Sequence, residues 1–345
     1  MPTTQKAINR AFSELIQKLN QQDKHPLLPS DRYIIFSDHH KGARNEADDF
    51  LPCEQTYLAA LDHYLDEGYT LIILGDAEEL WEEKAQNVLA AYKNVLLSET
   101  RFYKEERYIR VYGNHDDLWR YPTQVKKHLD PFFPGIQVQD GILFEYTSAD
   151  GLTGELFLTH GHQGTLDSDK LAWFSRIWLP LYREFQILTG IGKTTPAKDA
   201  CLRAEHDTKM YRWTQTRRNT ILIVGHTHRP IWSSQTHLEK LLNQLYTLRQ
   251  KNLDEPSAAT EEEIVQLKDE IKRRELKYPP CTDTIKTRPS YFNTGCCRFE
   301  DGDITGIELD NGQIRLIKWT KSEAEFVRLI LEETPLSEVF FFLEA

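Results

Sequence analysis

The stretch LIVGHTHRPIW, residues 222–232, places two histidines two positions apart directly after a run of apolar residues. A short apolar run of this kind is typical of a buried strand, and the polar residues stand where that strand ends. His226 and His228 are therefore either a satisfied structural pair or one half of a metal site. The motif alone leaves both interpretations open, so the rest of the chain must decide between them.

Five further runs of strand length also stop abruptly at a glycine, aspartate, histidine or asparagine, namely YIIFSD, TLIILGD, YIRVYG, ELFLTH and SYFNTG. Helical patterns such as EQTYLAALDHYLDEG separate the early runs, so the first half of the chain alternates strand and helix. This alternation predicts a layered α/β fold. Ligands of such folds gather beyond the carboxyl ends of the strands, where these polar residues stand.

Composition limits the class of protein. The 345 residues are 40% hydrophobic, which is ample for one decorated domain. With a net charge of −11, the chain is expected to repel the phosphate backbone, so long nucleic acid is not an expected partner. The sequence has no run of eighteen consecutive apolar residues, so no transmembrane segment is predicted. The five cysteines are odd in number and lack CxxC spacing, which favours reduced thiols. We therefore expect a cytoplasmic protein, in solution or at the membrane surface.

Two insertions interrupt the α/β pattern. Residues 166–218 are expected to form a helical cap whose first helix carries Trp173, Phe174, Ile177 and Trp178. Such an apolar helix either packs on the body or lines a pocket for a hydrophobic substrate.

The second insertion, residues 237–276, is predicted to be a helical hairpin with a leucine seam. The organisation expected is one domain over 1–345, with a core at about 30–165 and 219–320. Near the end of that core, the turn DNG at 310–312 predicts a β-hairpin.

The strand ends together supply two carboxylates, one amide and four imidazoles, without a thiolate. These candidate metal ligands are Asp38, His40, Asp76, Asn114, His160, His226 and His228. A mixed oxygen and nitrogen set suits Mn²⁺, Fe or Zn²⁺. Each cluster alone is explained by an ordinary turn, but their shared position at strand ends favours a metal site. Seven ligands are enough for two ions.

In this order, Asp-x-His, Gly-Asp-x-x-(Asp/Glu), Gly-Asn-His-(Asp/Glu), His-Gly and Gly-His-x-His resemble the motifs of the calcineurin-like metallophosphoesterases. The resemblance runs from Asp38 to His228 and implies a four-layer α-β-β-α sandwich. It also implies two divalent ions that share Asp76, with Mn²⁺ expected first and Fe or Zn²⁺ as alternatives. The implied ligand sets are Asp38, His40, Asp76 and His228 for one ion, and Asp76, Asn114, His160 and His226 for the other.

The resemblance further implies a hydrolase of phosphoric esters or anhydrides that acts by attack of a metal-bridging hydroxide on phosphorus. In such enzymes the position of His115 faces the phosphate and assists departure of the leaving group, and the acidic position of Glu79 orients it. Arg229 is expected either to contact a phosphate oxygen or to form a surface salt bridge.

Within the family, four segments are similar to the branch that contains the UDP-2,3-diacylglucosamine pyrophosphohydrolases, namely LGDAEELWEE, HGHQGTLDSDKLAWFSR, GHTHRPIW and YFNTGCC. This similarity implies a phosphorylated small-molecule or lipid-linked substrate, although His115, His162 and the hairpin at 237–276 depart from that branch. The alternatives are a nucleotide phosphodiesterase or nuclease of the same superfamily, and a non-catalytic scaffold with the same fold. The sequence does not indicate an oligomeric state.

Overall fold

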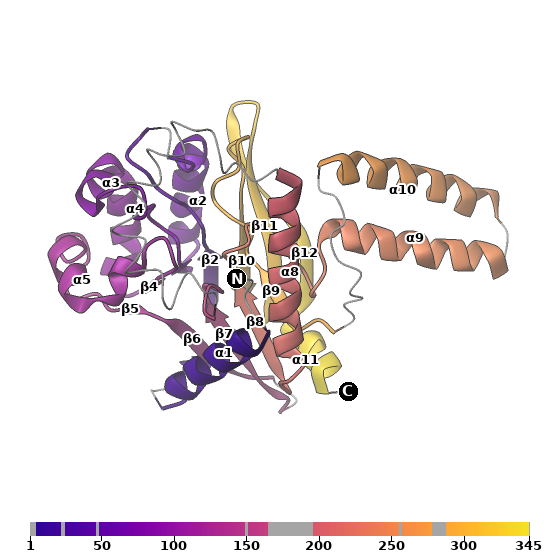
Figure 1. Ribbon diagram of the computed structural model, residues 1–345, viewed down its shortest axis with the longest axis horizontal. Coiled ribbons are helices and arrows are strands. Elements are labelled where there is room, and N and C mark those ends of the chain that lie inside the picture. The colour runs from indigo at the N-terminus through magenta and orange to yellow at the C-terminus, as the bar shows by residue number, and fades with distance from the viewer. Residues whose placement is uncertain are drawn as a thin grey trace.

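Two β-sheets lie face to face, and helices cover the outer face of each (Figure 1). The computed structural model describes residues 5–21, 25–45, 48–148, 151–164, 196–254, 257–277 and 288–344. The first sheet has seven strands in the order β12-β11-β10-β2-β3-β4-β5. The second has five, in the order β1-β6-β7-β8-β9.

The seven-stranded sheet has a parallel half and an antiparallel half. The parallel strands are β2 (Arg32–Phe36), β3 (Thr70–Leu74), β4 (Tyr108–Val111) and β5 (Val138–Gln139). The antiparallel strands are β10 (Ile304–Asp310), β11 (Gln313–Ser322) and β12 (Glu325–Pro335). The predicted turn between β10 and β11 is confirmed, and Asn311 and Gly312 both adopt the positive φ that a tight hairpin requires.

The five-stranded sheet contains β1 (His25–Leu27), β6 (Gly141–Thr147), β7 (Thr153–Thr159), β8 (Thr220–Val224) and β9 (Tyr291–Asn293). Strands β7, β8 and β9 run parallel to one another, whereas β6 is antiparallel to β7. The carboxyl ends of β7 and β8 therefore lie at the same edge of this sheet.

Alternating side chains explain the layers. In β2, Ile34 packs with the helices on the outer face, whereas Ile35 packs in the layer between the sheets. In β8, Ile223 faces that same inner layer, and Leu222 packs with the helices on the opposite side. The core therefore consists of three apolar layers between four structural layers, and the predicted α-β-β-α fold class is confirmed.

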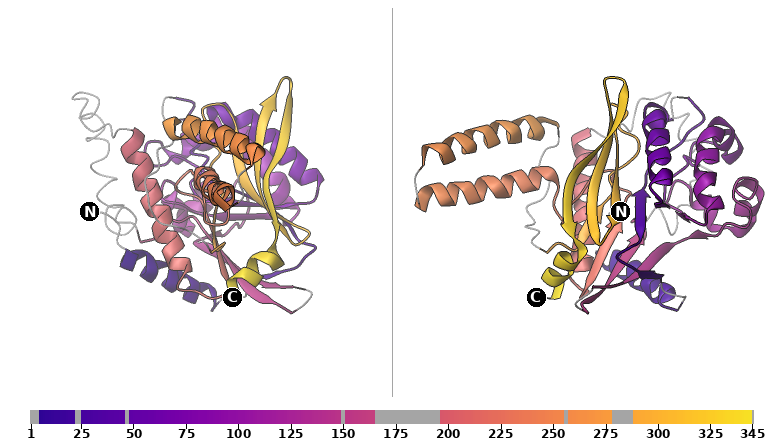
Figure 2. Two further views of the ribbon diagram at one scale, coloured as in Figure 1. Left: turned by 90° about the vertical axis from the view of Figure 1, so that its right-hand side faces the viewer. Right: turned by 180° about the vertical axis from the view of Figure 1, so that it is seen from behind.

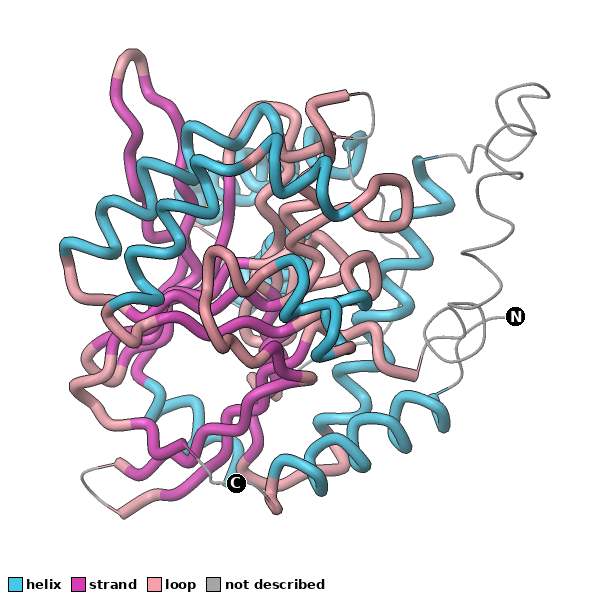
Figure 3. Tube along the Cα trace, turned by 90° about the vertical axis from the view of Figure 1, so that its left-hand side faces the viewer, coloured by secondary structure: helices cyan, strands magenta, loops and turns pink. Residues whose placement is uncertain are grey.

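Helices on the seven-stranded sheet are η1 (Leu51–Cys53), α2 (Glu54–Asp66), α3 (Ala85–Ala91), α4 (Lys93–Lys104), η2 (Asp117–Arg120) and α5 (Pro122–His128) (Figure 3). The other sheet is covered by α1 (Gln5–Leu19) and α8 (Pro196–Thr214). The last helix, α11 (Leu336–Glu344), packs its Phe340 into the layer between the sheets. Within the described residues, no helix is both long enough and apolar enough to span a membrane.

All six apolar runs identified in the sequence form strands, namely β2, β3, β4, β7, β8 and β9. Of the cap predicted at 166–218, the structure describes only α8 and the turn that follows it. The helix predicted to carry Trp173 and Trp178 lies outside the described residues. Cys53, Cys296 and Cys297 are free thiols, but Cys201 is disulfide-bonded, so the expectation of reduced thiols is wrong for Cys201.

Helices α9 (His237–Asp254) and α10 (Ala258–Lys277) form a hairpin that projects from the body (Figure 2). Its apolar side chains form a small cluster of their own around Leu241, Leu245, Ile264 and Ile271. An ion pair of 2.5 Å between Lys240 and Glu332 links α9 to β12. The hairpin therefore obtains its packing from its own two helices.

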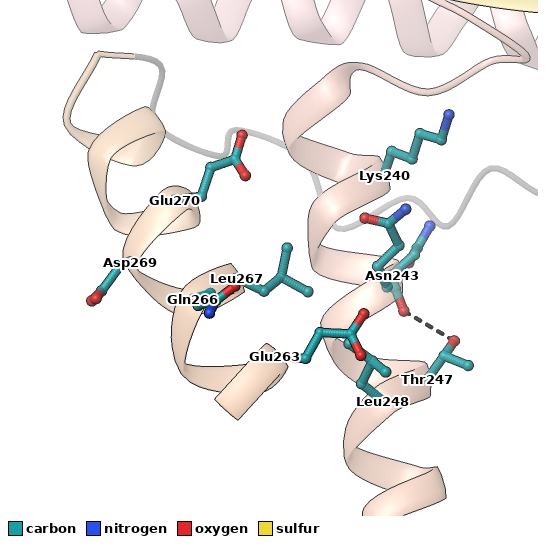
Figure 4. A pocket seen from close by; sticks show the side chains of 10 residues that line it. Lys240, Asn243, Thr247, Leu248, Glu263, Gln266, Leu267, Asp269 and Glu270 are labelled. Atoms are coloured by element: carbon teal, nitrogen blue, oxygen red, sulfur yellow. Dashed lines mark hydrogen bonds between the residues drawn. The ribbon is translucent and has the colours of Figure 1, made fainter. Parts of the chain in front are cut away.

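A groove of about 880 Å³ lies between these two helices (Figure 4). It is lined by Lys240, Asn243, Gln244, Thr247, Leu248, Glu263, Gln266, Leu267, Asp269 and Glu270. None of the candidate ligands from the strand ends contributes to it. The chemistry expected from the sequence is therefore not located in this groove.

Replacing residues 237–277 with a short Gly/Ser linker is expected to leave the Tm of the body within a few degrees of wild type, because the hairpin's apolar cluster is separate from the three main layers. Circular dichroism during heating measures this. The control Phe340→Ala removes a ring from the inner layer and should cost about 3–5 kcal/mol. An unfolded deletion variant would show that the body depends on the hairpin.

Candidate metal centre

The carboxyl ends of five strands meet at one place between the two sheets. Asp38 and His40 follow β2, Asp76 follows β3, and Asn114 and His115 follow β4. His160 follows β7 and His226 and His228 follow β8, so the second sheet brings three imidazoles to the three loops of the first. Parallel strands end at the same edge of a sheet, which is why residues far apart in sequence converge here.

The backbone at this meeting point is unusual. Left-handed φ values occur at Asp38 (53°), His40 (50°), Asp76 (51°), His226 (68°) and His228 (55°). Side-chain-bearing residues avoid this region, at a cost of roughly 1–2 kcal/mol each. Such conformations persist only where the surroundings hold them, and they concentrate at functional sites.

Hydrogen bonds between the loops hold these conformations. The amide of Asp38 donates to Gly75 O at 3.1 Å, and the amide of His40 donates to Asp76 O at 3.0 Å. Across the two sheets, the amide of His226 donates to the Asp38 carboxylate at 2.9 Å. Each loop is thus fixed by its neighbours.

One group of candidate ligands contains Asp38, His40 and His228, whose ligand atoms all lie within 4.8 Å of one another. His228 Nε2 lies 3.1 Å from Asp38 Oδ1 and 3.2 Å from His40 Nε2. His40 Nδ1 bonds the Glu79 carboxylate at 3.0 Å, so Nε2 is the nitrogen that faces the group. A carboxylate of this kind fixes the orientation of a metal-binding imidazole.

A second group contains Asp76, His160 and His226. His160 Nδ1 donates a hydrogen bond of 2.9 Å to Leu74 O. The other ring nitrogen, Nε2, lies 3.0 Å from Asp76 Oδ2 but forms no hydrogen bond with a described residue. Asn114 Oδ1 is also buried and has no hydrogen-bond partner among the described residues, and the amide of the next residue, His115, donates to Asp76 Oδ1 at 2.8 Å. A buried oxygen without a donor, on a loop that is bonded to Asp76, fits a ligand of a cation.

Asp76 also belongs to a third group, with His40 and His115. Its carboxylate is thus within reach of ligands from both sheets, which is the arrangement needed by a residue that is shared between two ions. His115 itself is only 24% exposed and its Nδ1 lies 2.8 Å from Glu79 Oε1. Its ring stacks on Trp81 with the centroids 3.9 Å apart.

The electrostatics of the site follow from its burial. Burial lowers the pKa of His40 and His160, but Asp38 and Glu79 raise the pKa of His40 to about 9, and Asp76 and Asp38 raise that of His160 to about 10. In the protein without metal, protons therefore balance the buried carboxylates. Divalent cations compete with such protons for the same ligand atoms, so the donor set fits a metal site.

Sequence reasoning missed the contribution of α8. His206 donates from Nε2 to Gly161 O at 2.9 Å, and its ring centroid lies 5.1 Å from that of His226. Asp207 is fully buried and accepts a hydrogen bond of 2.8 Å from Thr227 Oγ1. Neither residue follows a strand, so the pattern of polar residues at strand ends contained no signal for them.

Arg229 lies at the edge of the site. Its Nη1 donates to Asp207 Oδ2 at 2.9 Å, and Tyr291 donates its hydroxyl proton to Asp207 Oδ1 at 2.8 Å. In this structure Arg229 therefore makes an ion pair, but with the buried carboxylate of Asp207 rather than at the surface as expected. The same carboxylate fastens both Thr227 and Arg229, so α8 holds the loop that carries His226 and His228.

The fold and these clustered histidines and aspartates are those of a layered α/β protein with groups that could hold divalent metal ions. The chain belongs to the calcineurin-like phosphoesterase family, whose model matches residues 32–230, more than half of the chain. That family is generally hydrolytic, and together with the histidine and aspartate groups it indicates divalent metal binding.

The solved structures that match this chain have low sequence identity and low TM-scores. Vacuolar protein sorting 29 from Cryptosporidium parvum is 10% identical, with a TM-score of 0.37 over 88% of this chain and 98% of that one. A single mutant of Vps29 from Entamoeba histolytica is 11% identical, with a TM-score of 0.31 over 87% and 99%. No curated protein matches the sequence.

Two glycines allow the loops to approach one another. A Cβ on Gly113 would lie 2.6 Å from Asp76 N, and a Cβ on Gly225 would lie 2.8 Å from Ser37 Cβ, and each would also meet the carboxylate of the nearby aspartate. Gly113→Ala and Gly225→Ala are therefore expected to lower the affinity for Mn²⁺ at least tenfold, measured by isothermal titration calorimetry. The control Gly135→Ala introduces backbone strain, because the φ of Gly135 is +81°, but its new Cβ meets no atom within 4 Å, so it should bind Mn²⁺ normally. Normal binding by all three variants would contradict this packing argument.

Proposed function

We propose that this chain is a metal-dependent phosphoesterase that hydrolyses a phosphoester or pyrophosphate bond at the centre around Asp76. The observation that carries the proposal is that Asp76 belongs to ligand groups from both sheets, beside the unpartnered oxygen of Asn114. A shared carboxylate between two clusters of imidazoles is suited to two divalent ions. We expect Mn²⁺, with Fe or Zn²⁺ as alternatives.

Seven residues would hold these ions. One set would be Asp38, His40, Asp76 and His228, and the other Asp76, Asn114, His160 and His226. When bound, the ions would neutralise charge on the phosphoryl group and make a water molecule more acidic. The chain's own residues bind and orient these ligand atoms: Glu79 holds the His40 ring, and Leu74 O holds the His160 ring.

His115 would hold the proton that the leaving group needs. Because Nδ1 is bound to Glu79, Nε2 is the nitrogen left to donate to an oxygen atom that departs. Glu79 and the stacked Trp81 limit rotation of this ring. The Glu79 carboxylate is well suited to this role because, although burial raises its pKa, hydrogen bonds from His115 and His40 lower it to about 2. Glu79 therefore stays charged at neutral pH.

For the substrate, we propose a nucleotide-linked lipid or sugar such as UDP-2,3-diacylglucosamine. The support is the similarity of the segments around Asp76, His226 and Asn293 to that branch of the family. We also propose that Arg229 contacts a phosphate oxygen of the substrate. Its hydrogen bond to Asp207 uses Nη1, so the bond leaves the N–H groups on its other nitrogen atoms for such a contact. The cytoplasmic location is likewise still a prediction.

The experiment that tests the function is a turnover assay of the Mn²⁺-loaded protein on bis(p-nitrophenyl) phosphate and p-nitrophenyl phosphate, then on UDP-diacylglucosamine and other nucleotide diphosphates. Preference for a lipid-bearing diphosphate supports the proposed substrate. Preference for nucleotides or their diesters would favour a nucleotide phosphodiesterase or nuclease. A metal-loaded protein without turnover of any substrate would favour a non-catalytic scaffold.

Asp76→Asn is expected to remove most of the bound metal and most of the activity, because both proposed ligand sets lose the same negatively charged carboxylate. Metal content is measured by plasma mass spectrometry after dialysis against Mn²⁺. The control Asp62→Asn changes an exposed carboxylate on α2 and should retain wild-type metal content. Retention of two ions by Asp76→Asn would contradict a shared ligand.

His115→Ala is expected to lower kcat by roughly 10²–10⁴, the usual contribution of a positioned general acid, while metal content stays near wild type. The loss should be smaller for p-nitrophenyl esters, whose leaving group needs little protonation. His226→Ala is the matched variant, because it removes an imidazole assigned to metal binding and should lose metal. If His115→Ala loses metal to the same extent, His115 is a ligand rather than an acid.

A further inference from the structure

Behind the ligand loops lies a set of ionisable side chains that are completely enclosed by protein. These are Lys41, Glu78, Glu99, Arg110 and Asp116, each at most 1% exposed, and we refer to them as the ionic network. None of them belongs to the ligand groups. The role of these buried charges is not explained by the proposed chemistry.

The network is continuous. Arg110 forms an ion pair with Glu78 Oε2 and lies 3.9 Å from Asp116 Oδ2. Lys41 Nζ lies 3.3 Å from Glu78 Oε1 and 3.2 Å from Glu99 Oε1. Both cations thus contact Glu78, which stands at the centre.

Aromatic donors complete the shell of the two glutamates. Trp119 Nε1 donates to Glu78 Oε2 at 2.8 Å, and the Tyr108 hydroxyl donates to Glu99 Oε2 at 2.8 Å. The Tyr57 hydroxyl adds a bond of 3.3 Å to Glu99 Oε1. The anions of the network are thus held from several elements at once.

Residues of the network alternate with residues of the site along the chain. Lys41 follows His40, and Glu78 stands between Asp76 and Glu79. The two loops run side by side beyond the strand ends, because the Lys41 amide donates to Ala77 O at 3.1 Å and the Glu79 amide donates to Lys41 O at 3.0 Å. A movement of Lys41 or Glu78 would therefore move a site residue.

The third loop is tied in through Asp116, which follows His115. Its carboxylate accepts the amide of Gly113 at 2.6 Å and the amide of Ala77 at 2.9 Å. One side chain therefore joins the loop after β4 to the loop after β3. The network connects all three loops that leave the seven-stranded sheet.

Stability is a weak reason to bury such a network. Removing two or more charges from water is costly, and replacing a buried ion pair with apolar or neutral groups of similar size is often neutral or stabilising. Partners behind a metal site instead fix the orientation of its ligands. The interleaving of network and site residues favours this second purpose.

We propose that the ionic network is a positioning element that sets the spacing of His40, Asp76 and His115 and thereby the affinity of the site for metal. Lys41, Glu78 and Arg110 act through their neighbours and contact neither metal nor substrate. The effect on turnover rests on the proposed function, whereas the effect on metal affinity does not.

The test is the double variant Lys41→Met/Glu99→Gln, which removes one cation and one anion and preserves net charge and approximate volume. Its Tm is expected to stay near or above that of wild type, while its apparent affinity for Mn²⁺ falls roughly 10–100-fold, the usual effect of losing such partners. Calorimetric titration with Mn²⁺ and thermal melting are measured on the same preparations. In turnover assays, kcat should fall with little change in KM.

A matched control removes a buried ion pair that lies away from the site. Glu308 is fully buried, pairs with Arg328 on β12 and lies opposite Ile34 in the middle of β2, rather than beyond the carboxyl end of that strand. Glu308→Gln/Arg328→Met should leave Mn²⁺ affinity unchanged. Wild-type affinity in a stable Lys41→Met/Glu99→Gln protein would overturn the proposal, as would an equal loss of affinity in the control.

A single substitution tests the same proposal if the Lys41→Met/Glu99→Gln protein does not fold. Tyr108→Phe removes only the hydrogen bond to Glu99 and should lower Mn²⁺ affinity a few-fold. Unchanged affinity in that variant would overturn the proposal. If wild type binds Mn²⁺ but hydrolyses no phosphoester, the proposed function fails while this comparison of affinities still decides the role of the network.

Discussion

The site depends on the contact between the edges of the two sheets, which is made by hydrogen bonds of 2.9 Å from the His226 amide to the Asp38 carboxylate and from His160 Nδ1 to Leu74 O. Asp38 follows β2, the middle strand of the seven-stranded sheet, and His226 follows β8 of the five-stranded sheet. Without this contact, the four imidazoles would be divided between two separate edges. The three apolar layers fix the distance between the sheets, so the packing of the core determines whether the ligand groups can form.

The conformation of the ligand loops is unfavourable in free energy, because it combines backbone strain with buried charge. Five candidate ligands adopt left-handed backbone conformations, and the carboxylates and imidazoles among them are largely buried. Burial raises the pKa of Asp38, but the imidazoles of His228 and His160 outweigh it and hold that pKa well below its usual range. Strain and buried charge of this kind are expected at functional sites rather than in inert cores.

Two different supports hold the two halves of the site. The loops of the seven-stranded sheet rest on the buried charges around Glu78, whereas the loop after β8 is fastened to α8 through Asp207. The second support belongs to α8, the helix that precedes β8 in the chain. A change in the position of α8 would thus reach His226 and His228 directly, without passing through the first half.

Much of the fold could be predicted because the central strands are continuous apolar runs with abrupt polar ends. The residues after β2, β3, β4, β7 and β8 could be identified in the same way, since their positions follow from strand direction alone. Strand β12 was missed because half-exposed residues such as Leu329 and Ile330 carry no clear alternation. Asp207 and Glu78 were missed because their roles arise from contacts with distant elements, for which a single sequence has no pattern.

The most direct test of the account is anomalous X-ray diffraction from crystals of the protein loaded with Mn²⁺. Two anomalous peaks are expected, both in contact with the Asp76 carboxylate, with His40 and His228 beside one and His160 and His226 beside the other. A single peak, or peaks that do not contact Asp76, would contradict a centre of two ions that share Asp76.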